Sequence, residues 1–222
     1  MPSSGLIPRL RPAARVDLSV NAPLAFSSSV GIWTSPRPDH PSGNTGSPVN
    51  NELSLWGFHL PQAARIDAFA VDIPSGTANL DLHLGLYAGG ANRTLQTPTD
   101  LVCSTSLIGI TTTGTKVGIT TPATLQPGFY FTAMLPIGTS MPSFRLMSEP
   151  RAGHSYWHGL MNTAVWGSGD SGPGGNRGNA PSLMWSAAGQ TALPNSARYL
   201  QRKGDSSGTN LGVLIFMRLA AA

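Results

Sequence analysis

Residues 79–88 read Asn-Leu-Asp-Leu-His-Leu-Gly-Leu-Tyr-Ala, and this stretch decides the predicted fold class. Leucine occupies every second position from 80 to 86, and mostly polar residues lie between. Side chains along a β-strand point alternately to opposite faces, so the stretch has one leucine face and one polar face. On a helix the same leucines would spread around the whole circumference. The pattern therefore predicts a half-buried strand of an antiparallel sheet.

Similar stretches recur along the chain and predict an all-β protein. The predicted strands are 52–60, 65–73, 79–88, 100–108, 115–120, 128–135 and 143–147, with Gly- and Pro-rich turns between them. Residues 211–219 are apolar on both faces, which is typical of a buried central strand. We expect an antiparallel β-sandwich of jelly-roll or Greek-key type in one domain, 21–222. An extended arm, 1–20, is expected to precede it.

Composition narrows the function classes. Charged residues make up 11% of the 222-residue chain, against ~25% in average globular proteins, and glycine (26) and proline (19) are abundant. Such a surface suits an extracellular protein or one that belongs to an assembly, and it suits a cytosolic enzyme poorly. The net charge of +4 comes without any basic run interleaved with aromatics, so no nucleic-acid partner is predicted.

Cysteine content and hydropathy bear on the compartment. Cys103 is the only cysteine, so no intrachain disulfide can form, which would be unusual in a small secreted domain. Prolines interrupt the first 30 residues, which therefore lack the apolar core of a signal peptide. No apolar run approaches the ~20 residues of a membrane helix, so no membrane partner is predicted.

Two short motifs suggest chemistry that their surroundings do not support. Residues 169–172, Gly-Asp-Ser-Gly, match the nucleophile motif of trypsin-like proteases, but no histidine lies in the setting that this mechanism needs. Residues 167–172 also spell G-x-G-x-x-G, yet Pro173 and two glycines follow where a dinucleotide site requires a helix.

His154 and His158 have metal-ligand spacing without an evident third ligand. The chain is predicted to be no enzyme and to bind no cofactor or metal.

The stretch 148–195 breaks the strand rhythm and is predicted to be a long irregular loop region. Its aromatic and basic residues are candidates for subunit-interface or core packing, or for contact with a glycan, whose apolar face stacks on aromatic rings beside polar side chains. These candidates are Tyr156, Trp157, Trp166, Arg177 and Trp185. In the arm, Arg9, Arg11 and Arg15 are candidates for docking on an acidic protein partner, or they are solvated.

Four segments in this order resemble a β-sandwich module of tailed-bacteriophage virion proteins, which include tail, fibre and minor structural proteins. They are 65–73 (RIDAFAVDI), 84–88 (LGLYA), 113–116 (TGTK) and 125–133 (LQPGFYFTA). The similarity covers roughly residues 52–135, and the C-terminal strand more loosely. The chain departs from the family pattern at 89–92, where the family has an acidic turn. The resemblance implies no catalytic residues.

The resemblance implies a structural protein on the phage particle, assembled in the host bacterial cytoplasm. Two roles remain open: a fibre or tail component, and a capsid-decoration protein docked on head subunits. The alternative is a carbohydrate-binding module that recognises host surface glycans, and a glycan hydrolase or esterase is a remote option. The expected partners are other virion proteins and further copies of the chain. A homotrimer held by the 148–195 region and the arm is expected, with Trp157 and Trp166 as its anchors.

Overall fold

A computed structural model of the chain describes residues 32–34, 41–60, 62–76, 79–90, 97–147, 184–202 and 213–222. The regular elements within these ranges are all β-strands. They are β1 (Ile32–Thr34), β2 (Pro41–Gly46), β3 (Leu53–Leu60), β4 (Ala64–Ile73), β5 (Asn79–Gly89), β6 (Pro98–Ser104), β7 (Ile108–Ile110), β8 (Gly114–Leu125), β9 (Gly128–Ser140), β10 (Phe144–Met147), β11 (Met184–Ala187), β12 (Gln201–Arg202) and β13 (Ile215–Ala221).

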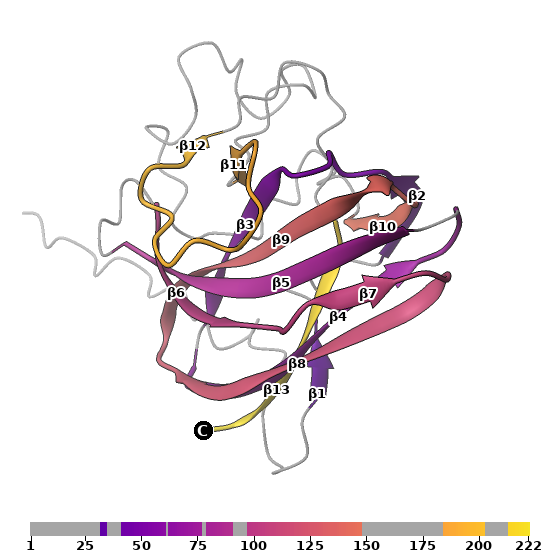
Figure 1. The fold of residues 1–222 in the computed structure, drawn as a ribbon. Helices are drawn as coiled ribbons and strands as arrows, with labels where there is room; N and C mark the ends of the chain where they lie inside the picture. The colour runs from indigo at the N-terminus through magenta and orange to yellow at the C-terminus, as the bar shows by residue number, and fades with distance from the viewer. Residues whose placement is uncertain are drawn as a thin grey trace, which may run out of the picture.

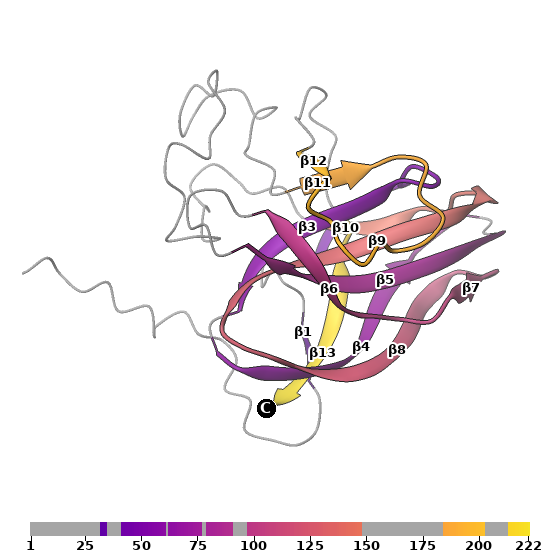
Figure 2. The same ribbon diagram turned by 60° about the vertical axis from the view of Figure 1, so that its left-hand side comes forward.

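The described strands form two main sheets and one ribbon. The small sheet has the order β1-β13-β4-β8, and β2 pairs with β10 in the ribbon. The large sheet has the order β12-β11-β3-β9-β5-β6, and β7 also pairs with β5. Every one of these pairings is antiparallel. The all-β, antiparallel prediction is confirmed, and the two sheets curl into a half-barrel (Figure 1, Figure 2).

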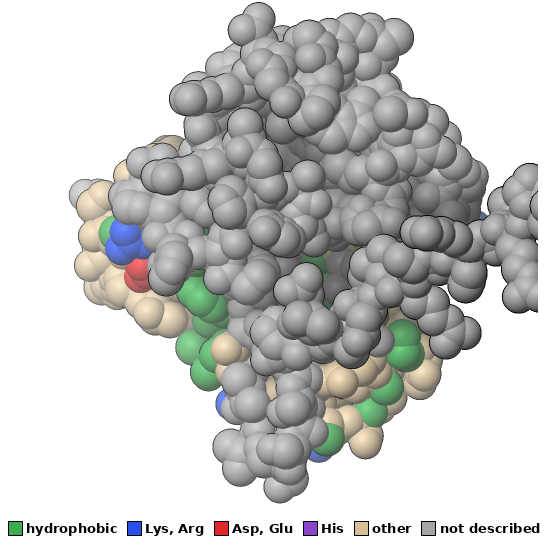
Figure 3. All heavy atoms as spheres, turned by 180° about the vertical axis from the view of Figure 1, so that it is seen from behind, with side chains coloured by type: hydrophobic (Ala, Val, Ile, Leu, Met, Phe, Trp, Pro, Cys, Tyr) green, Lys and Arg blue, Asp and Glu red, His purple; other side chains and the backbone are tan. Residues whose placement is uncertain are grey.

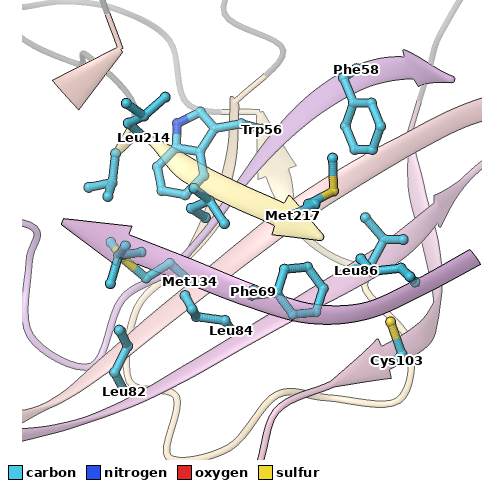
Figure 4. Close-up of a cluster of buried hydrophobic side chains, with 14 of the residues drawn as sticks. Trp56, Phe58, Phe69, Leu82, Leu84, Leu86, Cys103, Met134, Leu214 and Met217 are labelled. Carbon is cyan, nitrogen blue, oxygen red and sulfur yellow. The ribbon is translucent and has the colours of Figure 1, made fainter. Parts of the chain in front are cut away.

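The main hydrophobic core lies between the two sheets. Leu80, Leu82, Leu84 and Leu86 of β5 are all buried there, as the alternating pattern predicted. The small sheet contributes Phe69 and its neighbours on β4 and β13, which face these leucines (Figure 4). Burying one such side chain is worth ~1.5–3 kcal/mol, so this face of β5 contributes strongly to folding.

The opposite face of β5 departs from the prediction of a half-buried strand. Tyr87 is fully buried on that face, and Gly85 beside it is buried too. A second hydrophobic cluster covers them, formed by Leu53, Leu55, Tyr87, Phe131, Ala133, Leu135, Ala197 and Leu200. The C-terminal half of β5 is therefore buried on both faces, because residues 188–200 pack over the outer side of the large sheet.

The alternation in β9 follows its sequence. Phe131 and Ala133 face the second cluster, whereas Met134 belongs to the main core and Tyr130 packs against it. The large sheet is thus apolar on both sides in its centre. This arrangement needs a covering layer on each side, and the small sheet and residues 188–200 provide the two layers.

Three predicted elements differ in the structure. The strand β13 is central in the small sheet as expected, but only one of its faces is fully buried, since Phe216 and Arg218 are partly exposed on the other. The predicted strand 100–108 is divided into β6 and β7. Residues 41–46, where no strand was predicted, form β2, which pairs with β10.

Candidate functional site

The residues predicted to form a site fall mostly outside the described part of the chain. Tyr156, Trp157, Trp166 and Arg177 lie outside it, as do the arm residues Arg9, Arg11 and Arg15 and the motifs between 154 and 172. Trp185 is described as a backbone position in β11, where it pairs with Leu55 of β3 and Arg202 of β12. The expected irregular region therefore contains a strand at its C-terminal end, because β11 extends the large sheet beyond β3.

The candidate surface that follows Trp185 in the chain is the segment that joins β11 to β12. We call residues 188–200 the strap, since they cross the outer face of the large sheet over β9 and β5 (Figure 1). The backbone N–H of Gln190 donates to the carbonyl of Asn51 at 2.9 Å at one end of the crossing. Leu193 contacts the face of β5 at Gly85, where an added Cβ would lie 2.8 Å from the leucine Cδ1.

Glycine at position 85 leaves room for this close approach. The sequence placed this glycine on the polar face of the strand, and the structure shows that the neighbour is the strap. A Cβ at this position would displace the terminal methyl group of Leu193 and would lie 3.2 Å from the carbonyl oxygen of Cys103.

Tyr87 anchors the middle of the strap. Its hydroxyl donates a hydrogen bond to the carbonyl oxygen of Pro194 at 2.7 Å, and its ring is fully buried beneath the segment. Burial raises the pKa of this phenol far above its ordinary value, and the nearby Tyr199 raises it further. The hydroxyl therefore remains a neutral donor at every physiological pH, which suits a structural hydrogen bond and not a catalytic base.

The far end of the strap covers the edge of β6. The N–H of Leu101 donates to the carbonyl of Asn195 at 2.9 Å, and the N–H of Ala197 donates to the carbonyl of Thr99 at 2.7 Å. Arg198 reaches Asp100 at 2.8 Å in an exposed ion pair. An uncovered edge strand invites pairing with another chain, so the strap protects this side of the large sheet.

One aromatic side chain on the strap faces solvent. Tyr199 is 57% exposed, and its hydroxyl donates to Gln190 Oε1 at 3.4 Å. The backbone of Gln190 is bound to Asn51, and Tyr199 lies in a turn beside Leu200, whose side chain is buried in the second cluster. Exposed aromatic side chains beside amide groups are suited to contacts with proteins or sugars.

The two sheets meet along a seam between β7 and β8 (Figure 2). Thr105 and Thr120 form an isolated antiparallel bridge there, and both side chains are buried. Gly118 points into the seam, where an added Cβ would lie 2.5 Å from Ile108 Cδ1. The residues on either side of Gly118 consequently point outward, so Val117 and Ile119 are exposed together with Leu107. We call Leu107, Val117 and Ile119 the seam patch.

The outward face of the small sheet carries charges that are already paired. Arg218 donates to Asp67 at 2.6 Å and Arg145 donates to Asp72 at 3.2 Å, each through Nε. The guanidinium of Arg218 also lies 5.7 Å from the ring centre of Trp33, which is partly exposed. Figure 3 shows hydrophobic side chains recurring on the described part of the surface seen from behind, with few charged ones.

Among the described residues, few features support nucleophilic catalysis or metal binding. Cys103 is buried, and burial raises the pKa of its thiol to about 11, against a smaller lowering by a hydrogen bond with Thr120. A thiol in this state is mostly protonated and unreactive. Within the same ranges no three metal-ligating side chains come together. A membrane-spanning helix is also absent from the part of the chain that the structure describes.

His83 lies on the outer face of β5 and gives the fold a predicted pH dependence. Burial lowers the pKa of its imidazole, and the negative charge of Asp81 only partly opposes this shift. The unfolded chain then binds a proton at a higher pH than the folded protein does, starting near ~6.5. We expect stability to fall as the pH drops from ~6.5 through the lowered folded pKa. In His83→Gln this part of the pH dependence should be lost.

Urea unfolding of both proteins at pH 7 and pH 5 measures this effect. The wild type should lose more stability between the two pH values than His83→Gln, because only the wild type has an imidazole at position 83 that takes up a proton. An equal loss in the two proteins would show that His83 titrates in the folded state as it does in the unfolded chain.

Comparisons of the chain with protein-family models, with curated proteins and with solved structures give no match. The strap and the seam patch offer exposed aromatic and apolar side chains, and the charges on the described surface include ion pairs within the chain. Such surfaces are suited to contact with other molecules.

Proposed function

We propose that this chain is a non-enzymatic structural protein on the surface of a tailed-phage particle. The proposed fold is a β-sandwich of jelly-roll or Greek-key type. The segments that resemble phage virion modules support this proposal by their positions, since they lie in β4, β5, β8 and β9. β4, β5 and β9 are inner strands of the two sheets and β8 is the edge strand of the small sheet, so the resemblance involves the framework of the fold.

The observation that carries the proposal is the character of the described surface. Asp67, Asp72 and Asp100 each form an ion pair with an arginine of the same chain. Aliphatic side chains are exposed along the seam, whereas the negative charges of these three carboxylates are balanced by arginines. A surface of this kind favours contact with neighbouring proteins over acid–base chemistry, which needs free carboxylates of perturbed pKa.

The proposed partners are other virion proteins and further copies of the chain. In the proposed assembly the arm residues Arg9, Arg11 and Arg15 dock on a capsid or tail subunit. A homotrimer around the 148–195 region remains part of the proposal. The protein would occur in the virion after assembly in the bacterial cytoplasm.

Counting copies in purified particles tests this function. We expect the chain to co-purify with particles through a density gradient and to remain bound after washing in high salt. Hundreds of copies per particle would identify a capsid-decoration protein, and a handful would identify a tail or fibre component. If gradient-purified particles lack the chain while the infected cell contains it, the proposed function is wrong.

A second candidate function is recognition of host surface glycans, and Tyr199 is the observation that favours it. Its exposed ring lies on the strap, with the amide of Gln190 in contact and Arg198 next to it in sequence. Rings of this kind stack on sugar faces while the polar groups bind hydroxyls. Binding of purified protein to glycans of a host envelope, weakened by Tyr199→Ala, would support this function.

A further inference from the structure

We propose that the seam patch is where a second copy of this chain docks, patch against patch around a two-fold axis. The patch consists of Leu107, Val117 and Ile119, which are 50%, 48% and 58% exposed. Exposed aliphatic side chains are common singly, whereas a group of them at neighbouring positions of the fold is typical of an interface.

The backbone explains why these three side chains lie together. Gly118 faces inward and touches both Thr105 and Ile108. Leu107 lies between Thr105 and Ile108 in the chain. It is therefore held beside Gly118, and Val117 and Ile119 lie on either side of Gly118 in β8. Side chains two residues apart on a strand share one face, which fixes Val117 and Ile119 as neighbours.

The charge of the seam region favours a second copy as the partner. From residue 105 to 121 the only ionisable side chain is Lys116, and its ammonium donates to Thr112 Oγ1 at 2.7 Å. A two-fold axis brings identical surfaces together, so any strong net charge would repel itself. On the neighbouring strands Ile119 pairs with Ala68 and Ala68 pairs with Arg218, whose charge is balanced by Asp67, so this surface carries little net charge.

The size of the patch indicates how tightly the copies associate. Three half-exposed aliphatic side chains supply much less than the ~800 Å² per partner that a standard stable interface buries. Free protein should therefore dimerise weakly, and the contact becomes favourable where many copies are held close together. On this point alone the inference rests on the proposed function, which supplies a particle with many copies.

Cysteine crosslinking tests the two-fold contact directly. Cys103 is buried with a raised thiol pKa, so an engineered surface cysteine supplies nearly all the reactive thiol. Ile119→Cys places a thiol in the patch, and Val49→Cys is the matched control because Val49 is 56% exposed outside the patch. At equal micromolar concentration under mild oxidation, we expect disulfide-linked dimers of Ile119→Cys to form at least tenfold faster. Equal rates for the two variants would overturn the proposal.

A charge introduced next to the engineered cysteine shows whether crosslinking depends on the docked contact or on random collisions between molecules. Val117→Cys should crosslink rapidly, whereas Val117→Cys with Ile119→Lys should lose the tenfold advantage, because lysines would face each other across the axis. Thermal unfolding of both variants should give the same midpoint within a few degrees, since both positions are exposed. Persistence of rapid crosslinking in the lysine variant would also contradict the inference.

The experiment distinguishes this inference from the proposed function. Rapid crosslinking of free protein, with particles that lack the chain, would leave the second-copy contact standing and reject the phage role. Particles that contain many copies but show no Ile119→Cys crosslink would reject the contact and leave the structural role standing.

Discussion

Replacing Gly138 by valine is expected to destabilise the folded protein by about 3 kcal/mol. Gly138 lies in β9 opposite Leu80 of β5, at the irregular end of this strand pair. A Cβ at this position would lie 2.6 Å from the carbonyl oxygen of Asn79 and 2.7 Å from the Cα of Leu80. Both are backbone atoms, so no side-chain rotation relieves the clash. For a chain of this size the loss corresponds to a fall of ~6–12 °C in the unfolding midpoint.

The matched control for this substitution is Gly109→Ala. Gly109 also pairs with β5, opposite Asp81, but its nearest potential contact is Asp81 Oδ1 at 3.8 Å. We expect this variant to change stability by less than ~1 kcal/mol. Calorimetry of the two variants beside the wild type gives the comparison. If both variants unfold at nearly the same temperature, the tight approach of β9 to β5 is not what constrains Gly138.

The sequence predicted those parts of the fold that depend on short-range alternation. The leucines of β5 occur with the period of a strand and are buried together as expected. Phe129 and Phe131 of β9 have the same spacing and both pack in the second cluster, where Phe131 is fully buried and Phe129 partly. The strap could not be predicted in this way. Its hydrogen bonds join Leu101 to Asn195 and Asn51 to Gln190, more than 90 residues apart, and no local pattern encodes such pairings.

Alternation also has a limit that the seam illustrates. In the run Val117-Gly-Ile119 a period of two places the larger residues on one face and would assign that face to the core. The structure has the opposite arrangement, because Ile108 and Thr105 from the neighbouring segment fill the inward space at Gly118. Because these side chains fill the inward space, residue 118 has no side chain of its own and is glycine. A β-branched pair around a buried glycine is the signal that could have indicated this outward patch.

The predicted binding residues illustrate a different limit. The composition of residues 148–195 predicted an aromatic surface. Of the candidate residues selected there, only Trp185 lies within the described ranges, and only its backbone is described. What the described part adds is the strap, which carries the exposed side chain of Tyr199. Tyr199 is one isolated aromatic residue in a turn-rich stretch, so periodicity gave no reason to select it.

Replacing Tyr87 by alanine is expected to loosen the strap and to cost about 3–5 kcal/mol, the range measured for large buried aromatic side chains. The substitution removes the ring that fills the space under the strap and the hydroxyl that binds Pro194 at 2.7 Å. The strap has fewer buried contacts than the inter-sheet core, so it should open locally before the sheets separate. Hydrogen exchange should show this as faster exchange at the amides of Leu101 and Ala197, which pair with the strap and β6.

Two comparisons make this expectation specific. Tyr87→Phe keeps the ring and loses only the hydrogen bond, so it should cost ~1 kcal/mol and leave the second cluster packed. In the Tyr87→Ala variant, hydrogen exchange at the amide of Thr105 measures opening of the core. This amide donates to the carbonyl of Leu84 at 2.8 Å inside the fold. We expect the amides of Leu101 and Ala197 to accelerate at least tenfold more than that of Thr105. Equal acceleration at all three amides would mean that strap and sheets unfold as one unit, and the strap would then be part of the core and not a separate covering layer.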